Sequence, residues 1–420
     1  MSWFALVESN TTGSGRLFAR CARDLGLRPV LLARDPGRYP YVGADRLDAR
    51  VVDTGDPAAV RAACDDLGGP VAGVTSSSEY YVATAGEVAR WLGLPHPDPD
   101  AVRACRDKAV QRDRLRRAGL PGPGYARAGT PAAAVAAAGR IGWPVVVKPV
   151  AGSGSVGVRR CTGPAALCEA ARAVLDADPG RMGLPAQDAV VVEQYLPGPE
   201  YSVETFDESV VAVLRKHLGP EPHFVETGHD LPAPLAPAAR AAIGDAALAA
   251  LRALGLGWGP AHVELRHTPA GPRVIEVNPR LAGGMIPRMV QEATGVDLIA
   301  QTVARVTGSH PALAPTRARC AAIRFLVAGA AGRLVGIDGV ARARDVPGVV
   351  EVGITCPPGQ DLEIRHSFQD RLGYVIAVGE DGAGAGAAAE AGLGALTARI
   401  APRRAAAPAV GWDASVPREQ

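Results

Sequence analysis

The segment Val274-Ile275-Glu276-Val277-Asn278-Pro279-Arg280 decides the fold of this 420-residue chain, because polar side chains recur at every second position of an apolar run. In an extended strand, side chains at period two share a face, so Glu276, Asn278 and Arg280 point to one side. The valine and isoleucine residues between them point to the opposite side, where a core is expected. The segment therefore predicts a strand with one buried face and one face that carries polar groups.

A second carboxylate occurs twelve positions before Glu276, at the end of the segment Ala261-His262-Val263-Glu264. Turn residues at 268–271 separate the two apolar runs, so the runs are predicted to pair as strands on which Glu264 and Glu276 converge. Two carboxylates and the amide oxygen of Asn278 form a set of hard oxygen ligands that suits Mg²⁺. The alternative is a solvated strand face with incidental charges.

A glycine-rich loop follows a strand predicted over 141–150. This strand delivers Lys148 to its end, and the sequence continues as Ala151-Gly152-Ser153-Gly154-Ser155-Val156-Gly157. Glycines allow backbone N–H groups to approach phosphate oxygens, and a lysine adds a positive charge. The P-loop order GxxxxGK[ST] is absent, so the sequence indicates a phosphate-covering loop of another kind, with a plain Gly/Ser turn as the alternative.

A third segment, residues 190–204, runs from an apolar strand into the stiff linker Pro197-Gly198-Pro199 and then to Glu200. The linker leaves backbone groups free for a flat heteroaromatic ring, and the carboxylate of Glu200 can accept hydrogen bonds from ribose hydroxyls. Any strand–turn–strand unit would look the same, so this segment gains meaning only beside the other two.

In this order and spacing, the three segments resemble the ATP-grasp superfamily, and in particular its carboxylate–amine ligases, which include the L-amino acid ligases that make dipeptides. The resemblance covers about residues 1–400 and is strongest over 141–297. It includes Phe224-Val225-Glu226-Thr227-Gly228-His229 and Asn278-Pro279-Arg280-Leu281. It implies an α/β (α+β) ATP-grasp fold and an enzyme that uses ATP to form an amide or peptide bond.

The resemblance implies binding roles for the polar residues of these segments. The residues that would contact the ATP phosphates are Lys108, Lys148, Gly152, Ser153, Gly154, Ser155, Val156 and Gly157. The residues that would contact the rest of the nucleotide are the adenine hinge Glu193, Gln194, Tyr195 and Leu196, then Glu200 on the ribose, with Lys216 as a further candidate. The ligands of two Mg²⁺ ions, for which Mn²⁺ could substitute, would be Glu264, Glu276 and Asn278.

Three residues would take part in the chemistry. Arg280 would bind the carboxylate substrate and stabilise the charge of its acyl phosphate. Glu226 and His229 would line the acceptor site and orient or deprotonate the amine, a task for which a histidine suits neutral pH. Two simpler interpretations stay open: Lys108 as a solvated helix lysine, and Glu226 with His229 as a loop pair that caps a neighbouring strand. Gly283-Gly284 would leave room for a bulky acid, or form the turn that starts a helix.

The implied reaction has two steps. A carboxylate attacks the γ-phosphate of ATP to give an acyl phosphate and ADP, and an amine then displaces phosphate to give the amide. An ATP-grasp carboxylase that acts through carboxyphosphate, or an ATP-binding regulator without turnover, is the alternative function. The Gly-x-Gly at 13–15 suggests a dinucleotide fingerprint, but Phe18 occupies its third small position, so NAD binding is not expected.

The strand–helix pattern and the resemblance together divide the chain into five regions. Residues 1–97 alternate strands with helices, which implies parallel βαβ units of a Rossmann-like preATP-grasp domain. The other regions are ATP-grasp subdomain A with the glycine-rich loop (98–185), subdomain B with the adenine hinge and magnesium site (186–310), an α+β closing domain (311–402) and an Ala/Pro-rich tail expected to be disordered (403–420). Within subdomain A, one helix is predicted over 100–118, with a solvated face formed by Arg112, Arg114, Arg116 and Arg117.

The bulk composition excludes several classes of protein. The 45 basic and 43 acidic residues give a net charge of +2, without the concentrated basic face that nucleic-acid binding needs. The seven cysteines include no CxxC pair, so neither a disulfide framework nor a zinc site is expected. No apolar run approaches the ~18 residues that cross a bilayer, and the N-terminus lacks a basic signal-peptide region. We expect a cytoplasmic protein with small-molecule carboxylate and amine substrates, no nucleic-acid or membrane partner, and a homodimer as an option.

Overall fold

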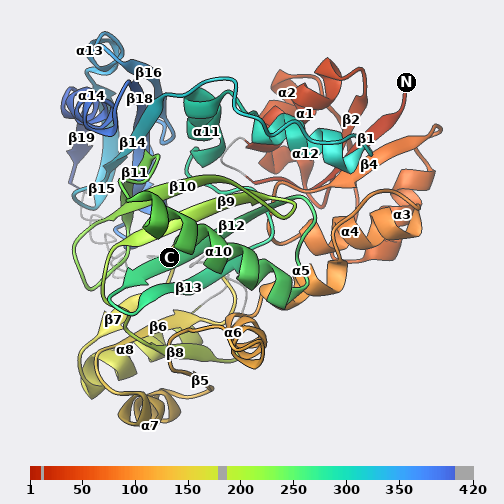
Figure 1. Ribbon diagram of the computed structural model, residues 1–420. Helices are drawn as coiled ribbons and strands as arrows, with labels where there is room; N and C mark the ends of the chain where they lie inside the picture. Colours follow the sequence, from red (N-terminus) through yellow and green to blue (C-terminus); the bar gives the residue numbers. More distant parts are fainter. Residues whose placement is uncertain (11–13, 178–186, 403–420) are drawn as a thin grey trace, which may run out of the picture.

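The computed structural model describes residues 1–10, 14–177 and 187–402, and four β-sheets organise this part of the chain (Figure 1). The tail expected at 403–420 lies outside the described residues. None of the described helices is long and apolar enough to span a membrane. Parallel and antiparallel sheets occur together with helices, as the predicted α/β (α+β) class requires.

The N-terminal region is built on a parallel sheet of order β3-β2-β1-β4. Its strands are β1 (Trp3–Val7), β2 (Arg28–Ala33), β3 (Asp48–Val51) and β4 (Val71–Thr75). Its helices are α1 (Ser14–Asp24), η1 (Pro36–Arg38), α2 (Tyr41–Ala44), α3 (Pro57–Asp65) and α4 (Val82–Trp91). The strand order reverses between β1 and β4, which is where open α/β sheets bind ligands. The segments that follow these two strands, 8–10 and 76–79, both line the cavity described below.

A smaller antiparallel sheet of order β5-β8-β6-β7 lies at the bottom of Figure 1, next to two helices. Its elements are β5 (Tyr125–Ala128), α7 (Pro131–Ile141), β6 (Val145–Pro149), β7 (Arg159–Cys161), α8 (Pro164–Leu175) and β8 (Val190–Gln194). The strand predicted from residue 141 begins only at Val145, because α7 continues to Ile141. β8 pairs with β5 and β6, although the predicted boundary at 185/186 separates it from them.

Two helices, α5 (Pro99–Cys105) and α6 (Lys108–Arg117), replace the single helix predicted over 100–118. The break is set by Asp107, whose extended backbone and side chain cap α6 by accepting hydrogen bonds from the N–H groups of Ala109 (2.8 Å) and Val110 (3.0 Å). The prediction of one continuous helix was wrong, because an aspartate before a helical run starts a new helix. The cap places Lys108 in the first turn of α6.

The largest sheet is antiparallel, with the order β13-β12-β9-β10-β11-β14-β18-β16. Its strands are β9 (Glu200–Phe206), β10 (Ser209–Leu218), β11 (Glu226–Leu231), β12 (Pro260–Thr268), β13 (Gly271–Asn278), β14 (Cys320–Val327), β16 (Val349–Ile354) and β18 (Arg371–Gly379). The sheet crosses the predicted boundary at 310/311, because β11 pairs with β14. The C-terminal strands therefore extend the sheet that carries the polar segments.

Helix α10 (Pro237–Leu254) lies across one face of the central strands in Figure 1. Val263 and Leu265 of β12 are fully buried in the core that α10 shares with this face. The alternate residues of β12, which are His262, Glu264 and Arg266, line the cavity on the other face. Period two along the strand thus separates the core from the polar site, as the sequence predicts.

The remaining elements lie around the far half of the large sheet, except α12, which packs against the N-terminal sheet and α1 (Figure 1). They are α11 (Ile286–Thr294), α12 (Leu298–Val306), α13 (Val340–Arg344), η2 (Phe368–Asp370), α14 (Gly382–Gly394) and the three-stranded sheet of β17 (Asp361–Leu362), β15 (Gly332–Asp338) and β19 (Thr397–Ala401). Alanines of α14 pack against alanines of β14 and β18 in one small cluster. This close packing fixes the C-terminal strands, and with them the turn at η2.

Candidate active site

A cavity of about 1110 Å³ is lined by residues of the N-terminal sheet, of the small sheet and of strands β9, β11, β12 and β13. Most predicted site residues line it: Lys108, Lys148, Gly152, Ser153, Gly154, Ser155, Val156, Glu193, Gln194, Tyr195, Leu196, Glu200, Glu226, Glu264, Glu276, Asn278 and Arg280. Gly157, Lys216 and His229 are not among the lining residues. Three segments distant in sequence therefore meet around one space.

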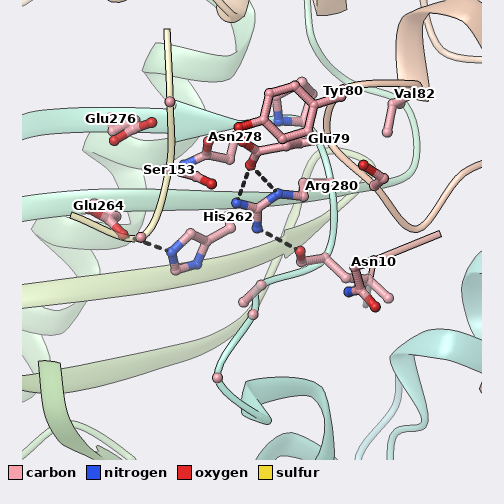
Figure 2. A pocket seen from close by; sticks show the side chains of 18 of the residues that line it. Asn10, Glu79, Tyr80, Val82, Ser153, His262, Glu264, Glu276, Asn278 and Arg280 are labelled. Atoms are coloured by element: carbon pink, nitrogen blue, oxygen red, sulfur yellow. Dashed lines mark hydrogen bonds and ion pairs between the residues drawn. The ribbon is translucent and has the colours of Figure 1, made fainter. Parts of the chain in front are cut away.

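The two predicted metal-binding carboxylates lie on neighbouring strands. β12 and β13 pair in the register that sets Glu264 opposite Glu276 and His262 opposite Asn278, and Figure 2 shows all four beside the cavity. The described residues contain no group of three or more His, Cys, Asp or Glu that could hold a metal ion alone. Two carboxylates and one amide leave coordination positions for phosphate oxygens and water, as Mg²⁺ requires. The residues fit a magnesium site that the nucleotide completes.

A lysine ammonium group lies against each of these carboxylates. Lys216 Nζ is 2.8 Å from Glu264 Oε1, and Lys108 Nζ is 3.1 Å from Glu276 Oε1. Each carboxylate therefore already binds a positively charged group. This supports the prediction that the two carboxylates can bind a metal cation.

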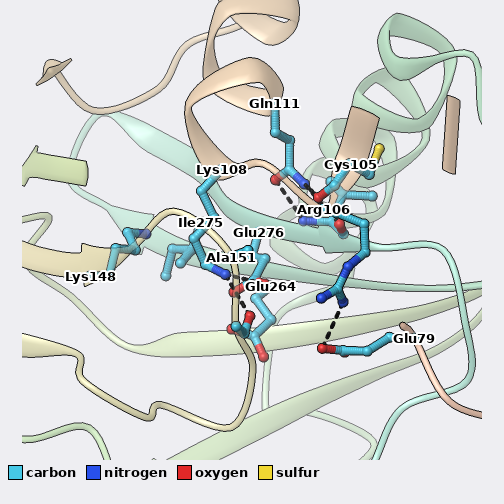
Figure 3. A network of polar contacts seen from close by, with 12 residues as sticks. Glu79, Cys105, Arg106, Lys108, Gln111, Lys148, Ala151, Glu264, Ile275 and Glu276 are labelled. Atoms are coloured by element: carbon cyan, nitrogen blue, oxygen red, sulfur yellow. Dashed lines mark hydrogen bonds and ion pairs between the residues drawn. The ribbon is translucent and has the colours of Figure 1, made fainter. Parts of the chain in front are cut away.

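Lys108 is held inside the protein by the strand end that precedes the glycine-rich loop (Figure 3). Its backbone N–H donates to Val150 O (3.0 Å), and its Nζ donates to Gly152 O (2.8 Å). The side chain is only 8% exposed, so the interpretation of Lys108 as a solvated helix lysine is wrong. Lys108 connects the glycine-rich loop to Glu276.

Lys148 shares one buried carboxylate with an arginine. Lys148 Nζ lies 2.7 Å from Glu193 Oε2, and Arg112 Nε lies 2.7 Å from Glu193 Oε1. Burial alone would raise the pKa of Glu193, but the charges of Arg112 and Lys148 outweigh it and hold this pKa at about 2. Burial lowers the pKa of Lys148, although Glu193 opposes the shift. The Glu193 side chain thus holds these two cations in place beside the predicted adenine hinge.

Arg112 was predicted to face solvent, and that prediction was wrong. Its side chain is 4% exposed, and besides Glu193 it binds the carbonyl of Val274 (2.8 Å). Arg116 and Arg117 are exposed, as expected. The spacing of Lys108, Arg112 and Leu115 on one helical face is a pattern that could have revealed the buried arginine.

The predicted adenine hinge is already partly hydrogen-bonded within the protein. The N–H of Gln194 donates to Gly124 O (2.7 Å) and that of Tyr195 to Pro144 O (3.1 Å). Arg266, which the sequence analysis did not single out, donates to Leu196 O (2.9 Å) and to Glu200 Oε2 (3.2 Å). Arg266 thus ties the hinge to the residue predicted to bind the ribose.

Lys216 is surrounded by carboxylates from three strands. Its Nζ lies 2.9 Å from Glu200 Oε1, 2.8 Å from Glu226 Oε1 and 2.8 Å from Glu264 Oε1. Burial would lower the pKa of Lys216, but the three carboxylates raise it well above its usual value. Lys216 is charged and joins residues predicted to bind the ribose, the amine and the metal.

Arg280 faces the cavity and is bound by a carboxylate of the N-terminal region. Its Nε donates to Glu79 Oε2 (2.8 Å), and Arg106 Nη1 lies 2.9 Å from Glu79 Oε1 (Figures 2 and 3). Burial alone would raise the pKa of Glu79, but Arg280 and Arg106 hold it at about 2. Sequence reasoning missed Glu79 and Arg106, whose only local hint is that Glu79 follows a strand at the switch point. The pair fixes the orientation of Arg280.

Glu226 lies on a strand, β11, and not in a loop as the simpler alternative interpretation had it. Besides Lys216, it accepts a hydrogen bond of 2.6 Å from Arg371 Nη2 at the start of β18. Burial would raise the pKa of Glu226, but Lys216 and Arg371 lower it well below its usual value. Arg371 is a site residue that sequence reasoning missed, because it lies 145 positions further along the chain.

His229 is fully buried beside Glu226. Its Nε2 lies 3.8 Å from Glu226 Oε2, its ring packs edge-on against Phe325, and neither ring nitrogen has a hydrogen-bond partner. Burial lowers the pKa of His229 to about 3, so the imidazole is neutral. A pKa of about 3 makes the imidazole a weak base, and the ring does not line the cavity, so these observations do not favour His229 as the proton acceptor, and this role stays a prediction.

His262 is a second histidine of the cavity, which sequence reasoning did not assign. Its Nδ1 lies 2.7 Å from Glu204 Oε1, and its Nε2 lies 3.1 Å from Glu264 Oε1. Burial would lower the pKa of His262, but Glu204 and Glu264 raise it to about 10. His262 therefore bridges Glu204 and Glu264 and fixes the orientation of the Glu264 carboxylate.

Comparison with known proteins places the chain in a family. The model of the ATP-grasp domain matches residues 141–288, and that of the L-amino acid ligase C-terminal domain 2 matches residues 324–401. The uncharacterized protein y4rH of Sinorhizobium fredii is 41% identical over 375 residues, which cover 89% of this chain and 78% of that protein. The chain belongs to the ATP-grasp carboxylate–amine ligases.

Other relatives of this ATP-grasp ligase match in part or in fold. Carnosine synthase 1 of Gallus gallus is 34% identical over 251 residues, which cover 54% of this chain and only 26% of that protein. The crystal structure of L-amino acid ligase from Bacillus licheniformis matches with a TM-score of 0.79 at 24% identity, over 96% of this chain and 99% of that chain. The predicted ATP-grasp fold and ligase class are confirmed, and the roles of single residues and the domain boundaries stay predictions.

Proposed function

We propose that this ATP-grasp ligase joins a carboxylic acid, such as an amino acid or a related acid, to an amine, with release of ADP and phosphate. The observation that carries the proposal is that one cavity brings together the carboxylate pair Glu264 and Glu276, the guanidinium of Arg280 and the carboxylate of Glu226. An acid activated at Arg280 would thus share one cavity with a metal–phosphate site and with a carboxylate able to bind an amine. The match to an L-amino acid ligase C-terminal domain supports an amino acid as one substrate.

The first step is phosphorylation of the acid. Arg280, oriented by Glu79, would bind the carboxylate so that one of its oxygens attacks the γ-phosphorus of ATP. The new O–P bond forms as the bond to the bridging oxygen of ADP breaks. Lys108 and Lys148 would place positive charge beside the phosphates while this charge is redistributed.

Glu264, Glu276 and Asn278 would hold Mg²⁺, two ions in the full complex, and their oxygen ligands would also suit Mn²⁺. When bound, magnesium neutralises phosphate oxygens and so lowers the cost of the charge that develops on them. Lys216 and Lys108 now neutralise these carboxylates, so metal binding would release both lysines toward the phosphates.

The second step is attack of the amine on the acyl phosphate. Glu226 is charged and would bind and orient the amine, and Glu226 or the neutral imidazole of His229 would take up the proton that leaves the nitrogen once the C–N bond has formed. The amine nitrogen bonds to the acyl carbon, the C–O bond to phosphate breaks, and phosphate leaves. Water must be excluded throughout this step, because it would otherwise hydrolyse the acyl phosphate.

The test is ADP release measured over a panel of acids and amines, each alone and in pairs, with mass spectrometry of the products. We expect ADP together with a product whose mass equals acid plus amine minus water. ADP release that depends on bicarbonate would instead indicate a carboxylase. ATP binding without ADP release for any pair would indicate a regulator, and either result would overturn the proposal.

A further inference from the structure

The C-terminal turn at η2 contacts the glycine-rich loop directly. The backbone N–H of Phe368 donates to Gly154 O (3.2 Å), and both residues line the cavity. A Cβ placed on Gly154 would lie only 2.2 Å from Phe368 Cδ1, so the aromatic ring occupies the space beside this glycine. Gly154 also has a φ of +64°, which favours glycine. The loop has its observed shape with the ring of Phe368 packed against it.

The turn that carries Phe368 is fixed from within the C-terminal region. The buried carboxylate of Asp370 accepts hydrogen bonds from the N–H groups of Arg365 (2.8 Å) and Ser367 (3.3 Å). The Ser367 hydroxyl in turn accepts from Gln369 N (3.3 Å), which completes a capping box. The carbonyl of Asp370 accepts from Ala328 N (2.8 Å), just after β14. The turn is therefore anchored beside β14 of the large sheet and is held independently of the loop.

A second contact holds the segment that follows the loop. His366 stacks face to face on His223, with ring centroids 3.9 Å apart and planes 2° apart. The neighbouring Pro222 O accepts a hydrogen bond from Arg160 N (2.9 Å), six residues after Gly154. The C-terminal turn thus reaches the loop at its tip and, through the His223 segment, near its end.

The same turn also reaches the amine side of the cavity. Arg371 follows Phe368 by three residues, and its guanidinium binds both the carboxylate (2.6 Å) and the carbonyl (3.3 Å) of Glu226. One short, rigid segment therefore connects the loop predicted to cover the phosphates with the residue predicted to bind the amine.

We propose that Phe368 is a positioning residue that holds the glycine-rich loop closed over the ATP phosphates and thereby keeps water from the acyl phosphate. This role rests on the ligase function proposed above. When the loop is loose, water attacks the acyl carbon, the bond to the phosphate oxygen breaks, and the acid and phosphate are released, so ATP is consumed without amide. The C-terminal region would then determine how much ATP is spent per amide formed.

The test compares Phe368→Ala with the full-length wild-type chain, and ADP and amide are measured in the same reaction. We expect the ratio of ADP to amide to rise about fivefold. This corresponds to a loss of about 1 kcal/mol in the free energy that favours the closed loop. Phe368→Leu, which keeps an apolar side chain, should lie between the two. General destabilisation would not change this ratio, because unfolded enzyme makes neither product.

Leu362→Ala is the matched control, because Leu362 is buried in the same C-terminal region, in a cluster with Leu334 and Leu372, and does not line the cavity. It should lower ADP and amide together and leave their ratio unchanged. An unchanged ratio in Phe368→Ala, or an equal rise in Leu362→Ala, would overturn the proposal.

A double-mutant cycle tests the contact itself. Gly154→Ala places a methyl group where the ring lies, but Phe368→Ala removes that collision, while the backbone strain at φ +64° is the same in both backgrounds. Gly154→Ala should therefore raise ADP per amide less in the Phe368→Ala chain than in the wild type. Additive effects would show that the two residues do not touch in the working enzyme.

A readout without amide separates this proposal from the proposed function. If no acid and amine pair gives amide, the ligase function fails, and the role of Phe368 is then decided by trypsin cleavage after Arg159 and Arg160, which follow the loop. With ATP and Mg²⁺ present, Phe368→Ala should be cut there about fivefold faster than wild type and Leu362→Ala. Equal cleavage rates would overturn the positioning role.

Discussion

The two buried lysines Lys148 and Lys216 differ in their partners. Lys148 shares the single carboxylate of Glu193 with Arg112, so two cations face one anion. Lys216 faces three carboxylates, those of Glu200, Glu226 and Glu264, so one cation faces three anions. The pKa of Lys148 is lowered by burial, whereas the pKa of Lys216 is raised because its carboxylates outweigh burial.

This difference shows what each charge cluster lacks. The Lys148 cluster has surplus positive charge and would attract an anion such as a phosphate group. The Lys216 cluster has surplus negative charge and would attract cations, which the proposed reaction supplies as Mg²⁺ and as the ammonium form of the amine. Charge alone would thus favour different substrates at the two clusters, before any specific contact is made.

The largest expected effect is on stability, in Lys216→Met. The substitution leaves three carboxylates without their shared cation. Removing one partner of a buried ion pair lowers the free energy of unfolding by about 3–5 kcal/mol. Urea unfolding should show this loss. Adding Glu226→Gln should restore part of it, because one negative charge is removed.

Lys148→Met is the matched substitution, and it should cost less, because Glu193 keeps its ion pair with Arg112. An equal loss of unfolding free energy in Lys148→Met and Lys216→Met would show that the number of charged partners does not distinguish the two lysines.

The next effect concerns catalysis, in Glu276→Ala. Loss of this carboxylate should lower the rate of ADP formation about 100- to 1000-fold, the usual cost of removing one group that stabilises transition-state charge. The exposed Glu208, on the hairpin between β9 and β10, provides the control Glu208→Ala, which should leave the rate unchanged. Removal of divalent cations with a chelator should abolish ADP release, and Mg²⁺ or Mn²⁺ should restore it. Retained ADP release in Glu276→Ala would remove Glu276 from the metal site.

A pair of variants tests the two charge clusters separately. Lys148→Met should raise KM for ATP about tenfold or more, since a hydrogen bond to a charged group contributes about 1.5–3 kcal/mol. Its KM for the amine should stay the same. Glu226→Gln should do the reverse and raise KM for the amine alone. Steady-state kinetics with each substrate varied in turn would measure this, and an equal rise of both constants in either variant would contradict separate roles for the two clusters.

The sequence predicted the part of the site that local spacing encodes. The positions of Glu264 and Glu276 on two strands joined by a tight turn determine their register, so their convergence follows from period two. The strand end at Lys148 and the loop after it are likewise contiguous in the chain. In both cases the residues that meet are few positions apart, and no tertiary information is needed.

The remaining contacts depend on tertiary packing. Glu79 meets Arg280 across 201 positions, and Arg371 meets Glu226 across 145. The two residues of each pair share no sequence motif, so no local sequence pattern could have predicted that they meet. The continuation of the large sheet from β11 into β14 is equally non-local, which explains why a boundary at 310/311 looked natural in the sequence. Arg112 is the exception, because its helical spacing to Lys108 was visible but was interpreted as a solvated face.

The smallest effect is a pH dependence of stability from His229. Its pKa is lowered from 6.5 to about 3 by burial, so the unfolded chain binds a proton between these values that the folded chain does not. The contribution is fully present above pH 6.5 and is lost as the pH falls toward 3, by about 1.4 kcal/mol per pH unit. The unfolding free energy of wild type relative to His229→Asn should therefore decrease between pH 7 and pH 5. The exposed His310 supplies the control His310→Asn, which should show no such change. If the wild type instead gained stability over His229→Asn as the pH fell, the imidazole would be charged in the folded protein and could not accept the proton of the amine.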